Sequence, residues 1–137
     1  MDHSGIPNTQ LIKEDKTLAA VYKNRSVAEQ NSLVLSWELL MDPRFAIFRQ
    51  VLCATDAELQ HFRELIVNGV MATDIADKDL KVLRNARWDK AFKQIDENES
   101  QRDSVNRKAT IVIEHLIQAS DIAHTMQHWY VLAALCS

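Results

Sequence analysis

The sequence predicts an all-α fold, and three observations carry that prediction. The 137 residues include only two glycines and two prolines, too few to supply the tight turns of long β-hairpins. Apolar residues recur at steps of three and four, as in the series from Leu59 through Phe62 to Val70. A hydrophobic fraction of 47% beside a charged fraction of 26% is typical of a soluble, helix-rich protein. We therefore expect one helical domain over residues 1–137.

The expected helices follow one another with short polar breaks between them. They cover residues 9–22, 26–41, 44–52, 55–73, 77–93 and a long stretch that starts near Ser104. Two of them begin with the pattern of a capping box, formed by Ser26 with Glu29 and by Thr55 with Glu58. The polar segment 94–104 shows no apolar periodicity, and we expect a flexible connector there within the domain.

Charge and motif content exclude several classes of function. A formal net charge of -3 and a pI near 5.9 give no general attraction to nucleic acid or anionic lipid. Basic residues stand at every third position from Lys78 to Lys93, but that spacing wraps them around a helix, so no nucleic-acid partner is expected. The sequence has no Gly-rich phosphate loop, no Cys-x-x-Cys pair and no serine elbow.

The cysteine content and the terminal residues predict a cytoplasmic setting. Two cysteines are too few for a disulfide framework, and the first residues lack the basic and apolar regions of a signal peptide. No apolar run approaches the roughly 18 residues of a membrane span, so none is expected in this chain. The sequence leaves open whether a longer gene product carries a membrane tether.

Asp121, His124 and His128 follow Ile113 and Ile117 on one side of the last predicted helix. At about 100° per residue these five positions fall within a sector of roughly 80°. An unpaired carboxylate buried there would cost several kcal/mol. Carboxylate and imidazole are ligands of zinc and other divalent metals, so a metal would supply the missing partner. Hydrogen-bonded core histidines are the structural alternative.

Other polar residues have structural alternatives as well. Glu29 has an ordinary place in the capping box, and Thr73 can donate to a carbonyl of its own helix. Asp74 extends a buried stripe, which calls for a hydrogen-bond partner or a cavity. Asp2 and His3, beside a glycine-containing turn, form an unremarkable polar terminus when taken alone.

Four segments in order resemble the catalytic domain of class I 3',5'-cyclic nucleotide phosphodiesterases, metal-dependent hydrolases with an all-helical, HD-like fold. The segments are "DHSGIPN" from Asp2, "LAAVYKNRSVAEQN" from Leu18, "VMATDI" from Val70 and "IQASDIAH" from Ile117. Their order and spacing agree from Asp2 to about Trp129. The resemblance implies hydrolysis of cyclic AMP, cyclic GMP or both to the 5'-nucleotide. Two divalent ions, zinc with magnesium or manganese, would activate the attacking hydroxide.

The resemblance also implies roles for particular residues. Asp121 would be the carboxylate shared by both metal ions, and His124 matches a position on the side of the nucleotide. Water molecules around the second metal would be held by His3, Glu29 and Thr73, with support from the polar residues Asp2, Asn8 and Asp74. His128 matches no metal ligand, which favours a structural role.

The chain also departs from the family pattern. Gln30, Asn31 and Ser32 stand where the family has Asn-His-His, and the other metal ligands and the proton-donating histidine belong to segments upstream of Met1. We therefore expect the middle portion of a catalytic domain, truncated at both ends and inactive alone, with Asp121 solvated, protonated or paired with a cation. Alternatives are a non-catalytic helical module that associates through uncovered helix faces, and an independent metal bundle built around Asp121, His124 and His128.

Overall fold

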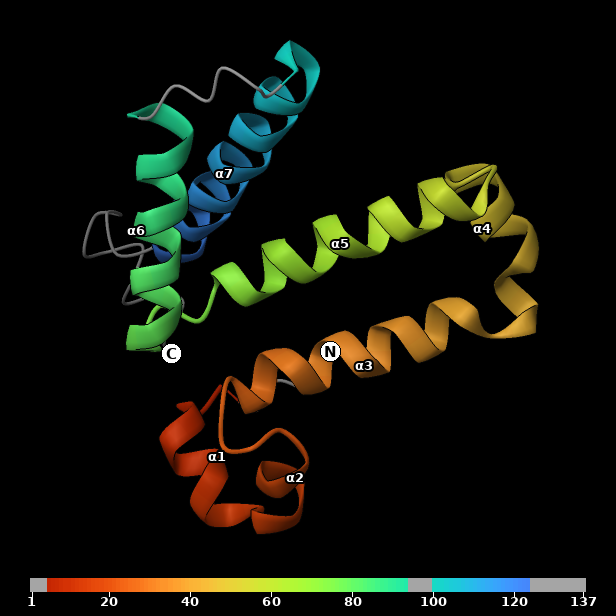
Figure 1. The fold of residues 1–137 in the computed structure, drawn as a ribbon. Coiled ribbons are helices and arrows are strands. Elements are labelled where there is room, and N and C mark those ends of the chain that lie inside the picture. The colour runs from red at the N-terminus through yellow and green to blue at the C-terminus, as the bar shows by residue number, and fades with distance from the viewer. Residues whose placement is uncertain (1–4, 94–99, 124–137) are drawn as a thin grey trace, which may run out of the picture. The chain divides into compact units, whose positions relative to one another are not determined.

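The structure, a computed structural model, describes residues 5–93 and 100–123. Over these residues the chain is helical and contains no strand, which confirms the all-α prediction (Figure 1). None of the helices in the described part is both long and apolar enough to cross a membrane. The elements are α1 (Asn8–Glu14), α2 (Lys16–Val21), α3 (Val27–Met41), the 3-10 helix η1 (Pro43–Phe45), α4 (Ala46–Leu52), α5 (Asp56–Ala72), α6 (Lys78–Phe92) and α7 (Gln101–Ile122).

The chain divides into two compact units, residues 1–77 and residues 78–137. In the first unit, α3 leads away from α1 and α2, and α5 returns beside it after η1 and α4 (Figure 1). The buried apolar side chains of this unit are small: Ala19 lies on α2, Val27 and Ala28 lie at the start of α3, and Ala72 lies at the end of α5. Small side chains there allow the helix ends to approach closely, which concentrates the polar groups described below.

The expected first helix over residues 9–22 is two helices, because Asp15 interrupts it. Asp15 has φ -122° and ψ 86°, outside the helical region, and its carboxylate accepts a hydrogen bond from the backbone N–H of Leu18 at 2.8 Å. Aspartate is a preferred N-cap residue, so it ends α1 and begins α2. The capping box of Thr55 and Glu58 is confirmed at the start of α5.

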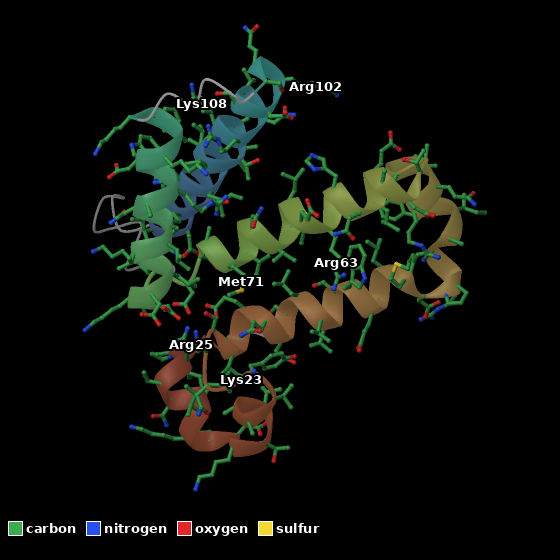
Figure 2. All side chains as sticks on the ribbon, viewed as in Figure 1. Lys23, Arg25, Arg63, Met71, Arg102 and Lys108 are labelled. Atoms are coloured by element: carbon green, nitrogen blue, oxygen red, sulfur yellow. The ribbon has the colours of Figure 1, made fainter. Side chains whose placement is uncertain are left out.

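The loop from α2 to α3 contains three non-glycine residues with positive φ. Lys23 and Asn24 end α2 in a Schellman motif, since the N–H of Asn24 donates to Ala19 at 2.8 Å and that of Lys23 to Ala20 at 3.2 Å. Ser26 follows with φ 39° and ψ 48°. Figure 2 shows Lys23 and Arg25 on this loop, at the start of α3. Left-handed backbone costs a non-glycine residue about 1 kcal/mol or more, so surrounding contacts must hold it.

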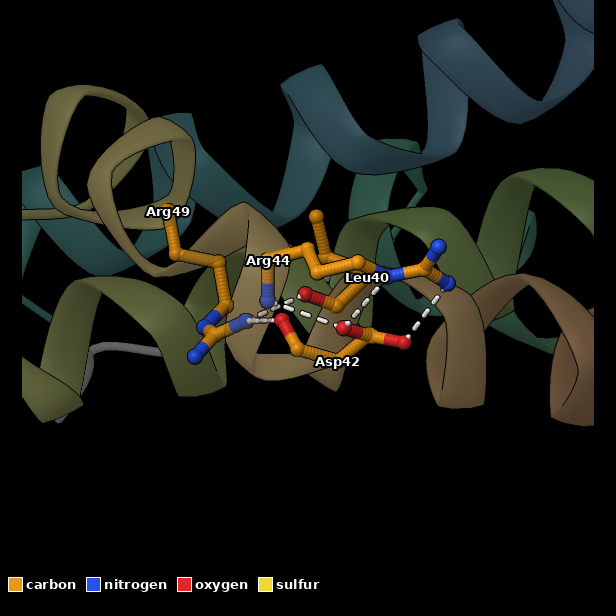
Figure 3. A network of polar contacts seen from close by, with 4 residues as sticks. All are labelled: Leu40, Asp42, Arg44 and Arg49. Carbon is orange, nitrogen blue, oxygen red and sulfur yellow. Dashed lines mark hydrogen bonds and ion pairs between the residues drawn. The ribbon is translucent and has the colours of Figure 1, made fainter.

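The turn between α3 and α4 is held by two arginines (Figure 3). Arg49 Nη1 donates to the carbonyl oxygens of Leu40 at 2.6 Å and Asp42 at 2.8 Å, which satisfies acceptors at the end of α3. Arg44 donates through Nε and Nη2 to both carboxylate oxygens of Asp42, at 3.0 and 2.9 Å. The hydrogen bonds from Arg44 lower the pKa of Asp42, and the same pairing raises the pKa of Arg44.

The second unit consists of α6 packed against α7. Glu114 on α7 is 3% exposed and forms an ion pair with Arg87 on α6, with Oε1 2.9 Å from Nη2. Beside this pair the ring of Trp88 lies 4.4 Å from Phe92 and 4.7 Å from His115, measured between centroids. The buried carboxylate of this helix is therefore Glu114, and its partner is a cation.

The face of α7 that packs against α6 differs from the face that the sequence predicted. Ile111 and Glu114 are its buried residues, whereas Ile113 is 47% exposed and Asp121 is exposed. At about 100° per residue, the centres of the two faces are roughly 90° apart. Ile113 therefore lies off the buried face. Asp121 lies within about 20° of Glu114 by the same geometry, and it is exposed nevertheless, two turns further along α7. The expected burial of Asp121 is wrong, whereas a solvated carboxylate, which was also expected, agrees with the structure.

The long helix begins earlier than expected. Ser100 caps α7 by accepting a hydrogen bond from the N–H of Asp103 at 3.1 Å, so the helix starts at Gln101 and not near Ser104. The last four residues of the expected connector 94–104 are therefore helical. Residues 94–99 lie outside the described part of the chain.

Candidate polar centre

Asn8, at the first turn of α1, connects three segments of the first unit. Its Oδ1 accepts a hydrogen bond from the backbone N–H of Ala28 at 2.9 Å. Its Nδ2 donates to Glu29 Oε2 at 2.8 Å and to Asp74 Oδ2 at 3.3 Å. Glu29 is 21 positions away in the sequence and Asp74 is 66 positions away. The amide therefore caps α3 from another helix and links two carboxylates.

Asp74 lies directly after α5 and is the buried acid of this unit, with 5% of its surface exposed. Its Oδ1 accepts from the backbone N–H groups of Ala76 at 3.1 Å and Asp77 at 3.2 Å. Its Oδ2 accepts from Ser26 Oγ at 2.7 Å. A buried carboxylate needs such donors, since each unsatisfied lone pair would be costly. The stripe of α5 therefore ends in a hydrogen-bonded acid.

The predicted capping box of Ser26 and Glu29 is absent. Ser26 makes no side-chain cap bond, because its left-handed backbone turns the hydroxyl toward Asp74. Glu29 is bound by Asn8 and not by the backbone of Ser26. Loss of an N-cap costs about 1 kcal/mol, which Asn8 offsets by capping Ala28 from α1. We define Asn8, Ser26, Glu29 and Asp74 as the polar centre.

Thr73 adjoins the polar centre but bonds within its own helix. Its Oγ1 donates to the carbonyl of Val70 at 2.7 Å, which is the structural alternative that the sequence allowed. The hydroxyl oxygen keeps its lone pairs for a further donor. Asp121 lies on α7 in the second unit. The candidates Asp2, His3, His124 and His128 lie outside the described residues.

Most side-chain polar atoms of the polar centre are oxygens, and carboxylate oxygens are suitable ligands for Mg²⁺, Mn²⁺ and Zn²⁺. Across residues 5–93 and 100–123, however, no three His, Cys, Asp or Glu side chains are grouped so that they could hold a metal ion by themselves. The chemistry fits residues that surround a metal centre and orient water and ligands. Ser26 was not expected from the sequence as a member of this group, because its pairing with Asp74 spans 48 positions.

Comparison with known protein families agrees with the helical fold. The family model of the 3'5'-cyclic nucleotide phosphodiesterases matches residues 1–137. The chain belongs to this family.

Individual relatives match most or part of the chain. A probable 3',5'-cyclic-AMP phosphodiesterase, pde-4 of Caenorhabditis elegans, is 29% identical over 90% of this chain and 18% of its own length. The human dual specificity calcium/calmodulin-dependent 3',5'-cyclic nucleotide phosphodiesterase 1B is 26% identical over 95% of the chain and 22% of its own length. The mouse 3',5'-cyclic-AMP phosphodiesterase 4C is 33% identical over 56% of the chain and 11% of its own. The chain thus spans about a fifth or less of these curated relatives.

Proposed function

We propose that residues 1–137 form the middle portion of a catalytic domain that hydrolyses cyclic AMP, cyclic GMP or both to the 5'-nucleotide. The observation that carries this proposal is the convergence of Asn8, Glu29 and Asp74 from three separate segments. These are residues that the family resemblance assigns to the surroundings of a metal centre. The substrate would be a cyclic nucleotide in the cytoplasm, where it acts as a signal.

Zinc with magnesium or manganese, when bound, would supply activation of water and neutralisation of phosphate charge. Asp121 would hold the metal pair through its carboxylate. Glu29 uses Oε2 to accept from Asn8, which leaves Oε1 to accept a hydrogen bond from water at the centre. Thr73 would offer its hydroxyl oxygen in the same way, with Asp2 and His3 contributing from the N-terminal turn and His124 from the side of the nucleotide.

The chain alone should be inactive, since Asp121 is the single direct metal ligand that the resemblance assigns to it. The test is to incubate the purified chain, and the longest product of its gene, with cyclic AMP or cyclic GMP plus magnesium and zinc. We expect 5'-nucleotide only from the longer product. Turnover by residues 1–137 alone would contradict the proposed incompleteness, and an inactive longer product would contradict the proposed activity.

A second candidate function is that of a non-catalytic helical module that binds a partner through uncovered helix faces. It is favoured by a groove of about 410 Å³ between α3 and α5, whose walls include Trp37 and Phe62. Figure 2 shows Arg63 between the two helices, and its guanidinium carbon lies 5.2 Å from the centroid of the Trp37 ring. On α4, Val51 is 81% exposed. Exposed apolar patches favour association. A monomer in light scattering with a cooperative thermal melt would count against this function.

A further inference from the structure

Ser26 combines three features that a simple helix cap does not need. It is 4% exposed, its backbone is left-handed with φ 39° and ψ 48°, and its hydroxyl makes no cap bond with α3. The hydroxyl instead donates to Asp74 Oδ2 at 2.7 Å, across 48 positions of sequence. Strained backbone that is held in place by tertiary contacts is concentrated at functional sites.

The bond from Ser26 begins a continuous chain of polar contacts. Asp74 Oδ2 accepts from Ser26 Oγ and also from Asn8 Nδ2, at 3.3 Å. The same Asn8 nitrogen donates to Glu29 Oε2 at 2.8 Å. Ser26 and Glu29 are only three positions apart, yet they are linked through two residues from α1 and from the end of α5. Displacement of the Asp74 carboxylate would therefore shift the Asn8 amide and release Glu29.

We infer that Ser26 is a positioning residue, which fixes the orientation of the Glu29 carboxylate through Asp74 and Asn8. This inference rests on the proposed function, in which Glu29 orients water at the metal centre. Ser26 itself touches neither the nucleotide nor the metals in this scheme. Its contribution should therefore appear in the chemical step and not in the affinity for the cyclic nucleotide.

Two substitutions separate the hydroxyl from the backbone. Ser26→Gly removes the hydroxyl but tolerates a positive φ, whereas Ser26→Ala removes the hydroxyl and keeps the steric penalty. If only the backbone conformation matters, Ser26→Gly will behave as wild type. If the hydroxyl matters, both variants will lose the orientation of Glu29. Ser100→Gly is the matched control, since it removes a true N-cap hydroxyl from α7 in the other unit.

The first readout is the NMR signal of the Asn8 side-chain amide in residues 1–137. In wild type we expect its two protons to be well separated in chemical shift and slow to exchange with water. In Ser26→Gly we expect exchange at least tenfold faster, with Ser100→Gly unchanged. An Asn8 amide that keeps its shifts and its exchange rate in Ser26→Gly would overturn the inference.

The second readout is hydrolysis by the longest gene product. We expect Ser26→Gly to lower kcat by about tenfold with KM unchanged, the size of effect that outer partners of metal sites have. An active wild type with an unchanged kcat in Ser26→Gly would overturn the positioning role alone. An inactive wild type would instead overturn the proposed function, so the two failures are distinguishable.

Discussion

Replacing Asn8 by alanine removes the residue that joins the segments of the polar centre. The N–H of Ala28 loses its cap, which costs about 1 kcal/mol. Glu29 loses a hydrogen bond to a charged group, worth about 1.5 kcal/mol at a half-buried position. The longer contact with Asp74, at 3.3 Å, contributes less, about 0.5 kcal/mol. We therefore expect Asn8→Ala to lower the free energy of unfolding of the first unit by about 2–3 kcal/mol.

Urea unfolding measures this loss directly. Trp37 reports on the first unit if Trp88 and Trp129 are replaced by phenylalanine in every protein compared. With an m-value of about 1.5 kcal/mol/M, the midpoint should fall by about 1.5 M. Gln10→Ala is the control, because Gln10 lies on the same helix and its side chain donates an exposed hydrogen bond to Glu14. A shift for Asn8→Ala no larger than that of Gln10→Ala would refute the bridging role.

Asn8→Asp separates the acceptor and donor roles of the same side chain. An aspartate still caps the N–H of Ala28, but it places a third carboxylate against Glu29 and Asp74. We expect this variant to be less stable than Asn8→Ala at pH 7, because a charged acceptor replaces the amide donor. An Asn8→Asp variant as stable as wild type would show that the donor contacts are unimportant.

The remaining predictions concern the ion pair, a helix cap and pH. Arg87→Leu should destabilise the second unit by roughly 2–3 kcal/mol in thermal melts, because Glu114 loses its cation, and adding Glu114→Leu should restore most of the loss. Additive effects would contradict this coupling. Thr55→Ala should cost about 1 kcal/mol by loss of the capping box at α5, and a change within error would contradict it. The lowered pKa of Asp42 means that its contribution to stability is present above the ordinary aspartate pKa and is lost as pH falls through the lowered value. In an NMR titration, Arg44→Ala should raise that midpoint, and an unmoved midpoint would exclude Arg44 as the cause.

The helices could be predicted because their signals are local. Few glycines and prolines, steps of three and four, and the box of Thr55 and Glu58 act within one or two turns. The break at Asp15 also has a local cause. An aspartate inside a polar stretch, however, can either cap a helix or continue one, and its sequence neighbours do not distinguish the two. The buried face of α7 is not predictable from the sequence, because both Ile111 and Ile113 lie within its apolar run. Which of the two is buried depends on where α6 packs.

The polar centre could be predicted only in part. Asn8, Glu29 and Asp74 were named through family resemblance, and their hydrogen bonds to one another come from packing that no sequence period encodes. Ser26 had the spacing of a capping box, and that local signal pointed to the wrong partner. A serine hydroxyl can accept a hydrogen bond from a helix N–H or donate one to a carboxylate. Its left-handed backbone decides between them, and that conformation is imposed by tertiary contacts.

Hydrolysis by Asp121 variants tests the proposed function most directly. The measurement is the rate of 5'-nucleotide release from cyclic AMP and cyclic GMP by the longest gene product, as wild type, Asp121→Ala and Asp89→Ala. Asp89 is the matched control, since it is an acid that forms an ion pair with Lys93 on the surface of α6. We expect Asp121→Ala to lose at least about a thousandfold in kcat, as removal of a shared metal ligand should, and Asp89→Ala to lose none. Equal rates for wild type and Asp121→Ala would contradict the assignment of Asp121 to the metal centre.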